Sequence, residues 1–356
     1  MLQNQKKRCF IELGKFLFQF SEINCQKNIN VLHNDLFFED FKALIQLSQS
    51  HNGWYTPENV YFAIQSWAKA LTEDNLNQWL SAYSFESSQD DKKEKTVAII
   101  LAGNIPLVGF HDFLSVLISG HKVLVKTSSN DQKLLPFLAK YLIAVDSELG
   151  IYINFSEGKL ENFDAVIATG SNNTARYFEF YFKDKPNIIR KSRNSVAVLN
   201  GKETREDLVN LGEDIFRYFG LGCRNVSKLF VPKDYDFDAF FKAIFEYKDV
   251  IFYEKYANNY DYNKAVFLMS NFKLLDNEFL TLKEDISHAS PISSVFFERY
   301  ENISDIQKRL EVETDQVQCI VSNNLIENSI SFGQTQQPKL WDYADNVDTI
   351  AFLLEI

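Results

Sequence analysis

Short apolar runs that alternate with helical patterns after residue 95 constrain the fold of this chain more than any other feature. The apolar runs lie at residues 96–102, 122–126, 151–155 and 164–168, with helical patterns at residues 107–119 and about 132–146. A short apolar run is typical of a strand buried on both faces, as in parallel sheets. The alternation therefore predicts a doubly wound α/β sheet with ligands at the carboxyl ends of its strands.

Small and polar residues follow three of the predicted strands. They are GNIP after the first strand, TSSN after the second and TGSN after the fourth. Parallel sheets bind ligands where such segments leave the strands, so we expect a ligand site here. The sequence has no G-x-G-x-x-G motif, and an ordinary Rossmann fingerprint is therefore absent.

A predicted helix and a predicted strand flank the segment FGLGC. Thr204 and Asp207 resemble a capping box, with aspartate in the usual Glu/Gln position, and indicate where the helix begins. Apolar residues then recur at helical spacing: Leu208, Leu211, Ile215 and Phe219. An apolar strand is predicted over residues 228–231. Cys223 thus lies in a glycine-containing loop between a helix and a strand.

The position of Cys223 suits a nucleophile. Gly220 and Gly222 allow another molecule to approach the backbone closely. A thiolate nucleophile needs access and nearby N–H donors, which such a loop can supply. A lone cysteine can equally be a small buried apolar residue, and the local sequence leaves both interpretations open.

Composition and charge exclude several classes of function. The chain has 356 residues, which is enough for two domains, and a net charge of −11, which argues against a nucleic-acid partner. No stretch approaches the roughly 20 uncharged apolar residues of a membrane span. Glu12 and Lys15 interrupt the apolar run near the N-terminus. We therefore expect no stable membrane insertion and no signal peptide.

The cysteines and histidines point to a reducing compartment without a bound metal. None of the four cysteines forms a Cys-x-x-Cys pair, which suits the cytoplasm. The five histidines lack metal-ligand spacing, so no metal site is predicted. We expect structural roles for His111, His121 and His288.

The sequence predicts four regions. Residues 1–86 read as helices, with Thr56 and Thr72 as N-caps, and are expected to pack on the next domain. The polar stretch 87–95 is the best linker. The expected regions are a helical part at 1–86, a dinucleotide-binding domain at 96–195, a catalytic domain at 196–333 and a C-terminal segment at 334–356. Further strands are predicted at residues 265–269, 294–297, 318–321 and 349–354.

Four motifs between residues 96 and 232 resemble the aldehyde dehydrogenase superfamily and occur in its order. They are AGNIPL, SGHKVLVKTSSN, ATGS and GLGC. Within that superfamily, three further segments resemble the acyl-CoA reductase branch, which includes the fatty-acid reductase of bacterial bioluminescence. These segments are RNSVAVLNG, SPISSVFFERY and QTQQPKLWDYADNVDT.

The resemblance implies an aldehyde dehydrogenase-like α/β fold and a set of site residues. Cys223 would be the nucleophile. Asn104 would hold the oxyanion together with the backbone N–H of Cys223. Lys126 would bind the ribose or phosphate part of the cofactor, and Gly170 and Ser171 would lie against the cofactor.

The resemblance also implies a reaction: reduction of an acyl-CoA, with a fatty acyl chain expected, to the aldehyde through a thioester on cysteine. NADPH is expected rather than NADH, because Ser129 stands where NAD-preferring relatives carry a glutamate that repels a 2′-phosphate. In hydrolytic relatives a glutamate activates water, and its position falls at about Ile189, which cannot accept a proton. Glu213 is an alternative base if that register is wrong. A homo-oligomer is expected.

Two other functions stay open at this point. An acyl-phosphate reductase on the same fold would need the same cysteine and no water-activating base. A non-catalytic nucleotide-binding subunit would need neither.

Overall fold

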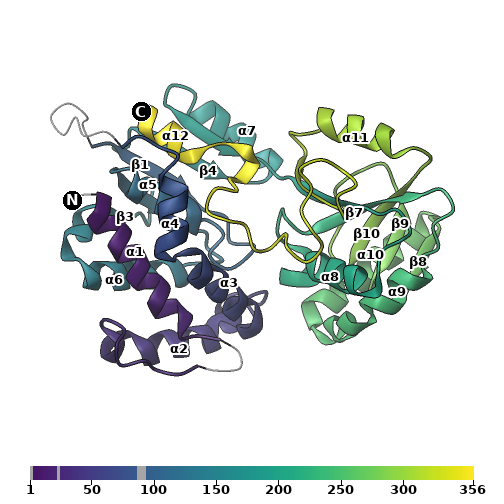
Figure 1. Ribbon diagram of the computed structural model, residues 1–356, viewed down its shortest axis with the longest axis horizontal. Coiled ribbons are helices and arrows are strands. Elements are labelled where there is room, and N and C mark those ends of the chain that lie inside the picture. The colour runs from purple at the N-terminus through teal and green to yellow at the C-terminus, as the bar shows by residue number, and fades with distance from the viewer. Residues whose placement is uncertain (1–2, 22–24, 86–93) are drawn as a thin grey trace. The chain divides into compact units, whose positions relative to one another are not determined.

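The computed structural model describes residues 3–21, 25–85 and 94–356 (Figure 1). The chain divides into two compact units. The first unit comprises Met1–Lys191 and Lys339–Ile356, and the second comprises Ser192–Pro338. Most of the predicted linker at residues 87–95 lies outside the described residues.

The first unit contains a five-stranded parallel sheet in the order β3-β2-β1-β4-β5. Its strands are β1 (Thr96–Ile100), β2 (Lys122–Lys126), β3 (Ile153–Phe155), β4 (Ala165–Thr169) and β5 (Asn187–Arg190). The order reverses beside β1, so the loops after β1, β2 and β4 leave the same edge of the sheet from neighbouring strands. This confirms the predicted doubly wound α/β sheet.

Helices connect these strands. They are α5 (Phe110–Ile118), α6 (Leu134–Val145), the 3-10 helix η1 (Ser147–Ile151) and α7 (Asn172–Tyr181). The helix after β1 begins later than the pattern predicted, because Leu107 has a left-handed backbone with φ of 57°. A left-handed residue cannot continue a helix, so residues 103–109 form a loop.

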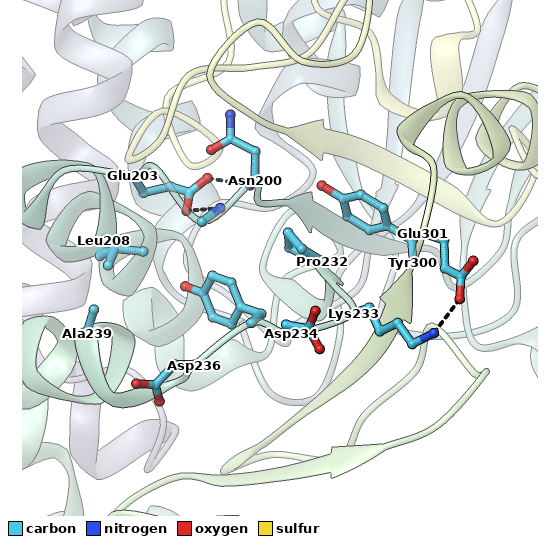
Figure 2. A pocket seen from close by; sticks show the side chains of 12 residues that line it. Asn200, Glu203, Leu208, Pro232, Lys233, Asp234, Asp236, Ala239, Tyr300 and Glu301 are labelled. Atoms are coloured by element: carbon cyan, nitrogen blue, oxygen red, sulfur yellow. Dashed lines mark hydrogen bonds and ion pairs between the residues drawn. The ribbon is translucent and has the colours of Figure 1, made fainter.

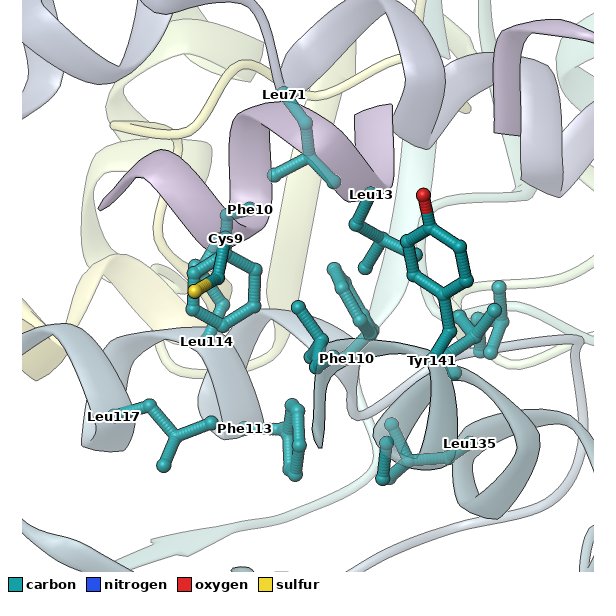
Figure 3. Close-up of a cluster of buried hydrophobic side chains, with 14 of the residues drawn as sticks. Cys9, Phe10, Leu13, Leu71, Phe110, Phe113, Leu114, Leu117, Leu135 and Tyr141 are labelled. Atoms are coloured by element: carbon teal, nitrogen blue, oxygen red, sulfur yellow. The ribbon is translucent and has the colours of Figure 1, made fainter. Parts of the chain in front are cut away.

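The N-terminal helices are α1 (Gln3–Phe18), α2 (Asn34–His51), α3 (Pro57–Ala70) and α4 (Glu73–Leu80). Thr56 and Thr72 cap α3 and α4 as predicted. Figure 3 shows Phe10 and Leu13 of α1 beside Phe110 of α5 and Tyr141 of α6 in one buried cluster. The N-terminal helices therefore share the core of the first unit instead of forming a separate one.

The C-terminal segment returns to the first unit through η4 (Ala344–Asn346) and α12 (Thr349–Glu355). The strand predicted at residues 349–354 is therefore wrong. Asp348 caps a helix here by accepting the Ala351 N–H at 2.9 Å, and Ile350 and Leu353 are buried at helical spacing.

Buried polar contacts hold this segment in place. The Arg190 guanidinium donates to the Asp112 carboxylate at 2.8 Å and to the Thr349 hydroxyl at 3.0 Å. His111 contacts the Leu340 carbonyl at 2.8 Å and His121 the Leu353 carbonyl at 2.7 Å, in agreement with structural roles for both histidines. Burial lowers the pKa of His111.

The second unit contains a six-stranded sheet in the order β11-β6-β7-β10-β9-β8, parallel except for β8. The strands are β6 (Asn194–Val198), β7 (Val226–Pro232), β8 (Leu274–Asp276), β9 (Thr281–Glu284), β10 (Ser294–Tyr300) and β11 (Val317–Val321). The strands predicted at residues 294–297 and 318–321 are thus confirmed as β10 and β11.

The helical elements of the second unit are α8 (Arg205–Phe216), η2 (Arg217–Gly220), α9 (Asp238–Ile244), η3 (Phe245–Phe252), α10 (Glu254–Met269) and α11 (Ile303–Val312). The strand predicted at residues 265–269 is wrong, since these residues are the last turns of α10. Tyr256, Tyr260 and Phe267 lie on one buried face at helical spacing, and this face decides the conformation of the apolar run that follows.

Among the described residues, no helix combines the length and the apolar character that a membrane crossing requires. The same part of the chain contains no cluster of three or more His, Cys, Asp or Glu residues that could hold a metal ion.

Candidate active site

Cys223 is exposed, and the backbone that leads to it is sharply turned. Helix α8 starts with the predicted Thr204–Asp207 capping box but ends at Phe216. Tyr218, Phe219 and Gly220 then follow with φ of 55°, 58° and 76°. The expectation that Phe219 continues the helix is therefore wrong. Left-handed geometry costs a non-glycine residue about 1 kcal/mol or more, so neighbouring contacts must hold this loop.

Asn225, two residues after the cysteine, supplies such contacts. Its side-chain amide donates to the carbonyl of Asp214 at 3.0 Å and to that of Arg217 at 2.8 Å. Its side-chain oxygen accepts the N–H of Gly222 at 2.8 Å. Asn225 is buried, with 3% of its surface exposed. One side chain thus joins the end of helix α8 to the residue immediately before Cys223.

Asp214 connects the same helix end to a distant segment. The carboxylate is fully buried and accepts the N–H groups of Gly333 at 2.7 Å and Thr335 at 3.0 Å, and the Thr335 hydroxyl at 2.8 Å. Burial raises the pKa of Asp214 to about 6, and it outweighs these hydrogen bonds, which lower the pKa. Arg224, next to the cysteine, donates to the Thr335 carbonyl at 2.6 Å.

The strands on either side of the cysteine loop add two further anchors. Ser195 on β6 is fully buried and donates its hydroxyl to the Cys223 carbonyl at 2.9 Å, while it accepts the Cys319 N–H at 3.1 Å. Ser227 on β7 donates to the His288 carbonyl at 2.6 Å. The cysteine loop is therefore tied to β6, β11 and the segment before β10.

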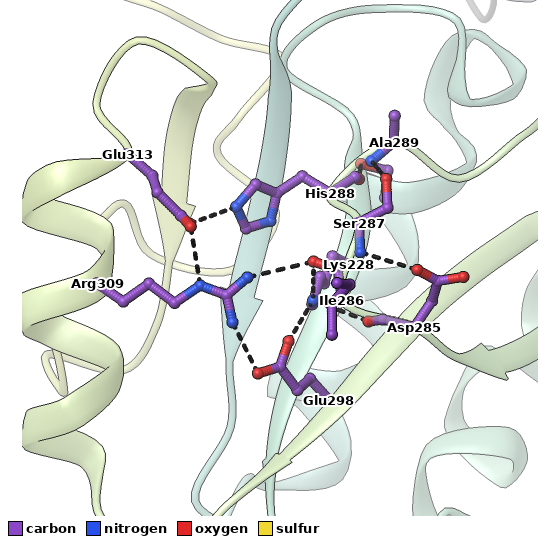
Figure 4. Close-up of polar contacts among 10 residues, drawn as sticks. Lys228, Asp285, Ile286, Ser287, His288, Ala289, Glu298, Arg309 and Glu313 are labelled. Atoms are coloured by element: carbon purple, nitrogen blue, oxygen red, sulfur yellow. Dashed lines mark hydrogen bonds and ion pairs between the residues drawn. The ribbon is translucent and has the colours of Figure 1, made fainter.

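Strand β7, which leaves the cysteine loop, carries a fully buried lysine (Figure 4). The Lys228 ammonium donates to the Asp285 and Ile286 carbonyls, both at 2.9 Å, and to Glu298 at 2.6 Å. Burial lowers the pKa of Lys228. His288, in the same network, contacts Glu313 at 2.6 Å, in agreement with a structural role.

The loops after β1 and β2 meet closely in the first unit. A Cβ atom on Gly103 would lie 2.7 Å from the Ser128 hydroxyl oxygen, so only glycine fits between these loops. Asn104, the next residue, is half-buried. Ser129 is exposed at the same edge, and the Lys126 ammonium donates to the Gly158 carbonyl.

Residues of the N-terminal part hold both sides of Asn104. The buried Asn52 side chain donates to the Gly103 carbonyl at 3.3 Å and to the Asn130 carbonyl at 3.2 Å. The Tyr55 hydroxyl donates to the Ile105 carbonyl at 2.9 Å. Sequence reasoning missed this role, because an amide or hydroxyl that bonds backbone carbonyls leaves no motif.

The loop after β4 contains Gly170 and Ser171. Ser171 caps helix α7 by accepting the Thr174 N–H at 3.2 Å. A Cβ atom on Gly170 would lie 3.1 Å from Thr174 and from the Phe178 ring, which leaves little room for any other residue. The N-terminus of α7, which favours anionic groups, therefore opens at the carboxyl edge of the sheet.

The structure brings five predicted residues to one edge of the first unit: Asn104, Lys126, Ser129, Gly170 and Ser171. Cys223 belongs to the second unit. The network of Asn225, Ser195 and Asp214 around the cysteine was not predicted. Asp214 gave a signal, since a charged residue stands in the apolar stripe between Leu211 and Ile215.

Ile189 and Glu213 are the two candidate positions for a water-activating base. Ile189 lies half-buried on the edge strand β5. Glu213, the alternative base, forms a two-pronged ion pair with Arg217 one turn further along the chain.

A hollow of about 750 Å³ lies elsewhere in the second unit (Figure 2). Residues that follow the carboxyl ends of β6, β7 and β10 line it, including Asn200, Lys233 and Glu301. Cys223 precedes the amino end of β7, so this hollow and the cysteine lie at opposite ends of the strand.

Solved structures define the class of fold. Aldehyde dehydrogenase 21 of Physcomitrella patens, in complex with succinate, aligns with a TM-score of 0.64 and 12% identity, over 100% of this chain and 84% of that one. A variant of aldehyde dehydrogenase C of Pseudomonas syringae, in complex with NAD⁺ and octanal, aligns at 0.59 and 12%, over 89% and 72% of the chains. The protein therefore has the aldehyde dehydrogenase fold.

Sequence comparison gives the family. The model of the acyl-CoA reductase (LuxC) family matches residues 57–244, more than half of the chain, and the chain belongs to this family. A long-chain acyl-protein thioester reductase of Photobacterium leiognathi is 24% identical over 189 residues. That match spans 48% of this chain and only 39% of the relative. The family is one of reductases, which accords with the resemblance found in the sequence.

Proposed function

We propose that this protein reduces an acyl-CoA, with a fatty acyl chain, to the aldehyde, with NADPH as the reductant and Cys223 as the carrier of the acyl group. The observation that carries the proposal is an exposed cysteine on a loop that buried side chains hold on both sides. Family membership supports the reaction class. The second unit would supply the nucleophile and the first unit the cofactor site.

The chain's own groups account for acyl transfer. The Cys223 thiolate attacks the thioester carbonyl, a new carbon–sulfur bond forms, and the CoA thiolate leaves. The Asn104 side-chain amide and the Cys223 backbone N–H would stabilise the oxyanion between these events. The cofactor, when bound, would supply the hydride, and Cys223 would leave the reduced acyl carbon as thiolate so that the aldehyde is released.

The carboxyl edge of the first sheet suits a dinucleotide. The N-terminus of α7 favours a pyrophosphate. Lys126 donates one of its three N–H groups to Gly158, so the ammonium can also meet an anionic ligand. Ser129 brings no negative charge to this edge, which favours NADPH over NADH.

The fate of the acyl-enzyme depends on the two candidate positions for a water-activating base. Ile189 cannot accept a proton, and Glu213 is paired with Arg217. Without a general base, water attacks the Cys223 thioester slowly, and the acyl group persists until hydride or CoA reaches it. The fatty acyl class is supported by the relative from Photobacterium leiognathi, whose name specifies long-chain acyl groups.

The test is to mix the protein with acyl-CoAs of varied length and NADPH or NADH, and to follow nicotinamide absorbance. Acyl phosphates form a parallel arm. We expect aldehyde formation from the CoA thioesters. In the reverse direction, a fatty aldehyde and oxidised cofactor should yield acyl-CoA only when CoA is added. Rapid release of free acid without CoA would overturn the assignment as a reductase.

A further inference from the structure

We infer that Asn225 is a positioning residue that sets the orientation of the nucleophile Cys223. This inference deepens the proposed function and rests on it. The loop concerned consists of Tyr218, Phe219 and Gly220 in left-handed geometry, followed by Leu221, Gly222 and the cysteine. Two backbone turn hydrogen bonds close this run locally, from the Leu221 N–H to the Tyr218 carbonyl at 3.1 Å and from the Asn225 N–H to the Gly222 carbonyl at 3.0 Å. Its direction relative to α8 depends on the side chains that bond its backbone.

The Asn225 amide uses both ends of its side chain. Its NH₂ group bonds the carbonyls of Asp214 and Arg217, which lie at the C-terminal end of α8, where helix carbonyls lack intrahelical partners. Its oxygen accepts the Gly222 N–H at 2.8 Å. Asn225 is buried, so water cannot readily replace these bonds if the side chain is removed.

These bonds bear directly on the nucleophile. The Gly222 N–H points to Asn225, which anchors the peptide unit before Gly222. The Ser195 hydroxyl, 2.9 Å from the Cys223 carbonyl oxygen, anchors the peptide unit after the cysteine. The peptide unit that carries the Cys223 N–H lies between these two. The direction of that N–H and of the side-chain thiol is therefore set from both sides.

A matched control variant distinguishes positioning of Cys223 from general support of the fold. Asn277, on the β8–β9 turn of the same unit, also closes a turn by accepting a backbone N–H, that of Leu280, at 2.9 Å. The bonds that its side chain accepts come from Phe279 and Leu280 and not from the cysteine loop. Asn277→Ala is therefore the matched control: it removes an asparagine that stabilises a turn but positions no nucleophile.

The experiment measures the iodoacetamide alkylation rate of Cys223 from pH 5 to 9 by peptide mass spectrometry. The proteins are wild type, Asn225→Ala, Asn225→Asp, Ser195→Ala and Asn277→Ala, each at a temperature well below its own Tm. We expect the rate–pH profile of Cys223 to change in the Asn225 and Ser195 variants and to match wild type in Asn277→Ala. If Asn225→Ala does not fold, Asn225→Asp decides, because it keeps the acceptor for Gly222 and replaces the donated hydrogen bonds by a carboxylate. The alkylation rates are then compared at pH 9, where the effect of that charge on the ionisation of the thiol is smallest.

A kinetic arm uses acyl-CoA and NADPH. We expect kcat to fall by about 100-fold in Asn225→Ala with KM nearly unchanged, since a small displacement of a reacting group has an effect of that size. A lower Tm with an unchanged alkylation profile and unchanged kcat would overturn the inference. Alkylation needs no acyl substrate, so failure of the proposed function, in which wild type reduces no acyl-CoA, is distinguishable from failure of this inference.

Discussion

The Asn104 loop and the Cys223 loop are held by the same chemistry, but from different distances along the chain. Asn52 and Tyr55 bond the carbonyls on either side of Asn104 from about 50 residues away. The Cys223 loop depends mainly on Asn225, two residues further on, and on its own unit. The comparison teaches that the N-terminal helices determine the geometry of Asn104, whereas the nucleophile loop is organised within the second unit.

The largest effect is expected at Asn104 itself. Removing one oxyanion donor typically lowers the rate by about 10²–10³-fold, so Asn104→Ala should slow acylation of Cys223 by that factor. Rapid-mixing measurement of CoA release gives this rate, and fluorescence quenching gives cofactor affinity, which should change little. A near-normal acylation rate would mean that Asn104 serves only as a loop residue.

Substituting Asn52 or Tyr55, which hold the backbone on either side of Asn104, should slow acylation less than the loss of Asn104 does. Tyr55→Phe removes only the hydroxyl that reaches Ile105, and Asn52→Ala removes the bonds to Gly103 and Asn130. We expect acylation to slow by about tenfold, because the donor is displaced by a fraction of an ångström.

Two controls sharpen this expectation. The alkylation profile of Cys223 should match wild type in both variants. In a double variant with Asn104→Ala, neither change should lower the acylation rate further. The effects of residues that act through one group do not add. A full additive loss would show that Asn52 and Tyr55 act independently of Asn104.

Ser129, at the carboxyl edge of the first sheet, provides the next test. Ser129→Glu places a carboxylate where it would repel a 2′-phosphate, and we expect the ratio of kcat/KM for NADPH to that for NADH to fall by about tenfold. Ser129→Gln, similar in size and uncharged, is the matched control and should leave most of the preference. Better use of NADH than of NADPH by the wild-type protein would contradict the argument.

The smallest expected effect is on protein stability, through the pH dependence of Asp214 at the end of the helix before the Cys223 loop. The pKa of Asp214 is about 6 when folded, above its ordinary value of 3.8. Between these pH values the folded protein keeps a proton that the unfolded chain releases, so the contribution of Asp214 to stability falls as pH rises through this window. Asp214→Asn removes this dependence.

Urea unfolding from pH 4 to 7 provides the measurement. The free energy of unfolding of wild type, minus that of Asp214→Asn, should decrease as pH rises from about 4 to about 6 and then level off. A difference that stays constant with pH would show that burial does not raise the pKa of this carboxyl group.

The sequence predicts four of the five strands of the first sheet, because these are short, apolar and separated by helices of clear period, and it misses β5 (Asn187–Arg190). Strand β2 has the predicted bounds, Lys122–Lys126. The runs at residues 265–269 and 349–354 were predicted as strands and are helices, because a run of five or six apolar residues fits either structure. The buried face of α10 depends on tertiary context, whereas Asp348 caps α12 through a local hydrogen bond that the strand prediction overlooked.

The site residues also divide into those that a sequence pattern indicates and those that it does not. Cys223 and Asn104 stand in motifs that the sequence displays, and their roles stay predictions. Asn225, Ser195 and Asn52 act on backbone groups, and such partners leave no trace in side-chain patterns. Spacing along the chain therefore indicates which residues do the chemistry more readily than which residues hold them.

The most direct test of the central claim is mass spectrometry of the protein after mixing with a fatty acyl-CoA and no reduced cofactor. We expect one acyl adduct, on the peptide that contains Cys223, absent from Cys223→Ser and retained in Cys319→Ser. An unmodified Cys223, with the acyl group on Cys9, Cys25 or Cys319, would contradict it.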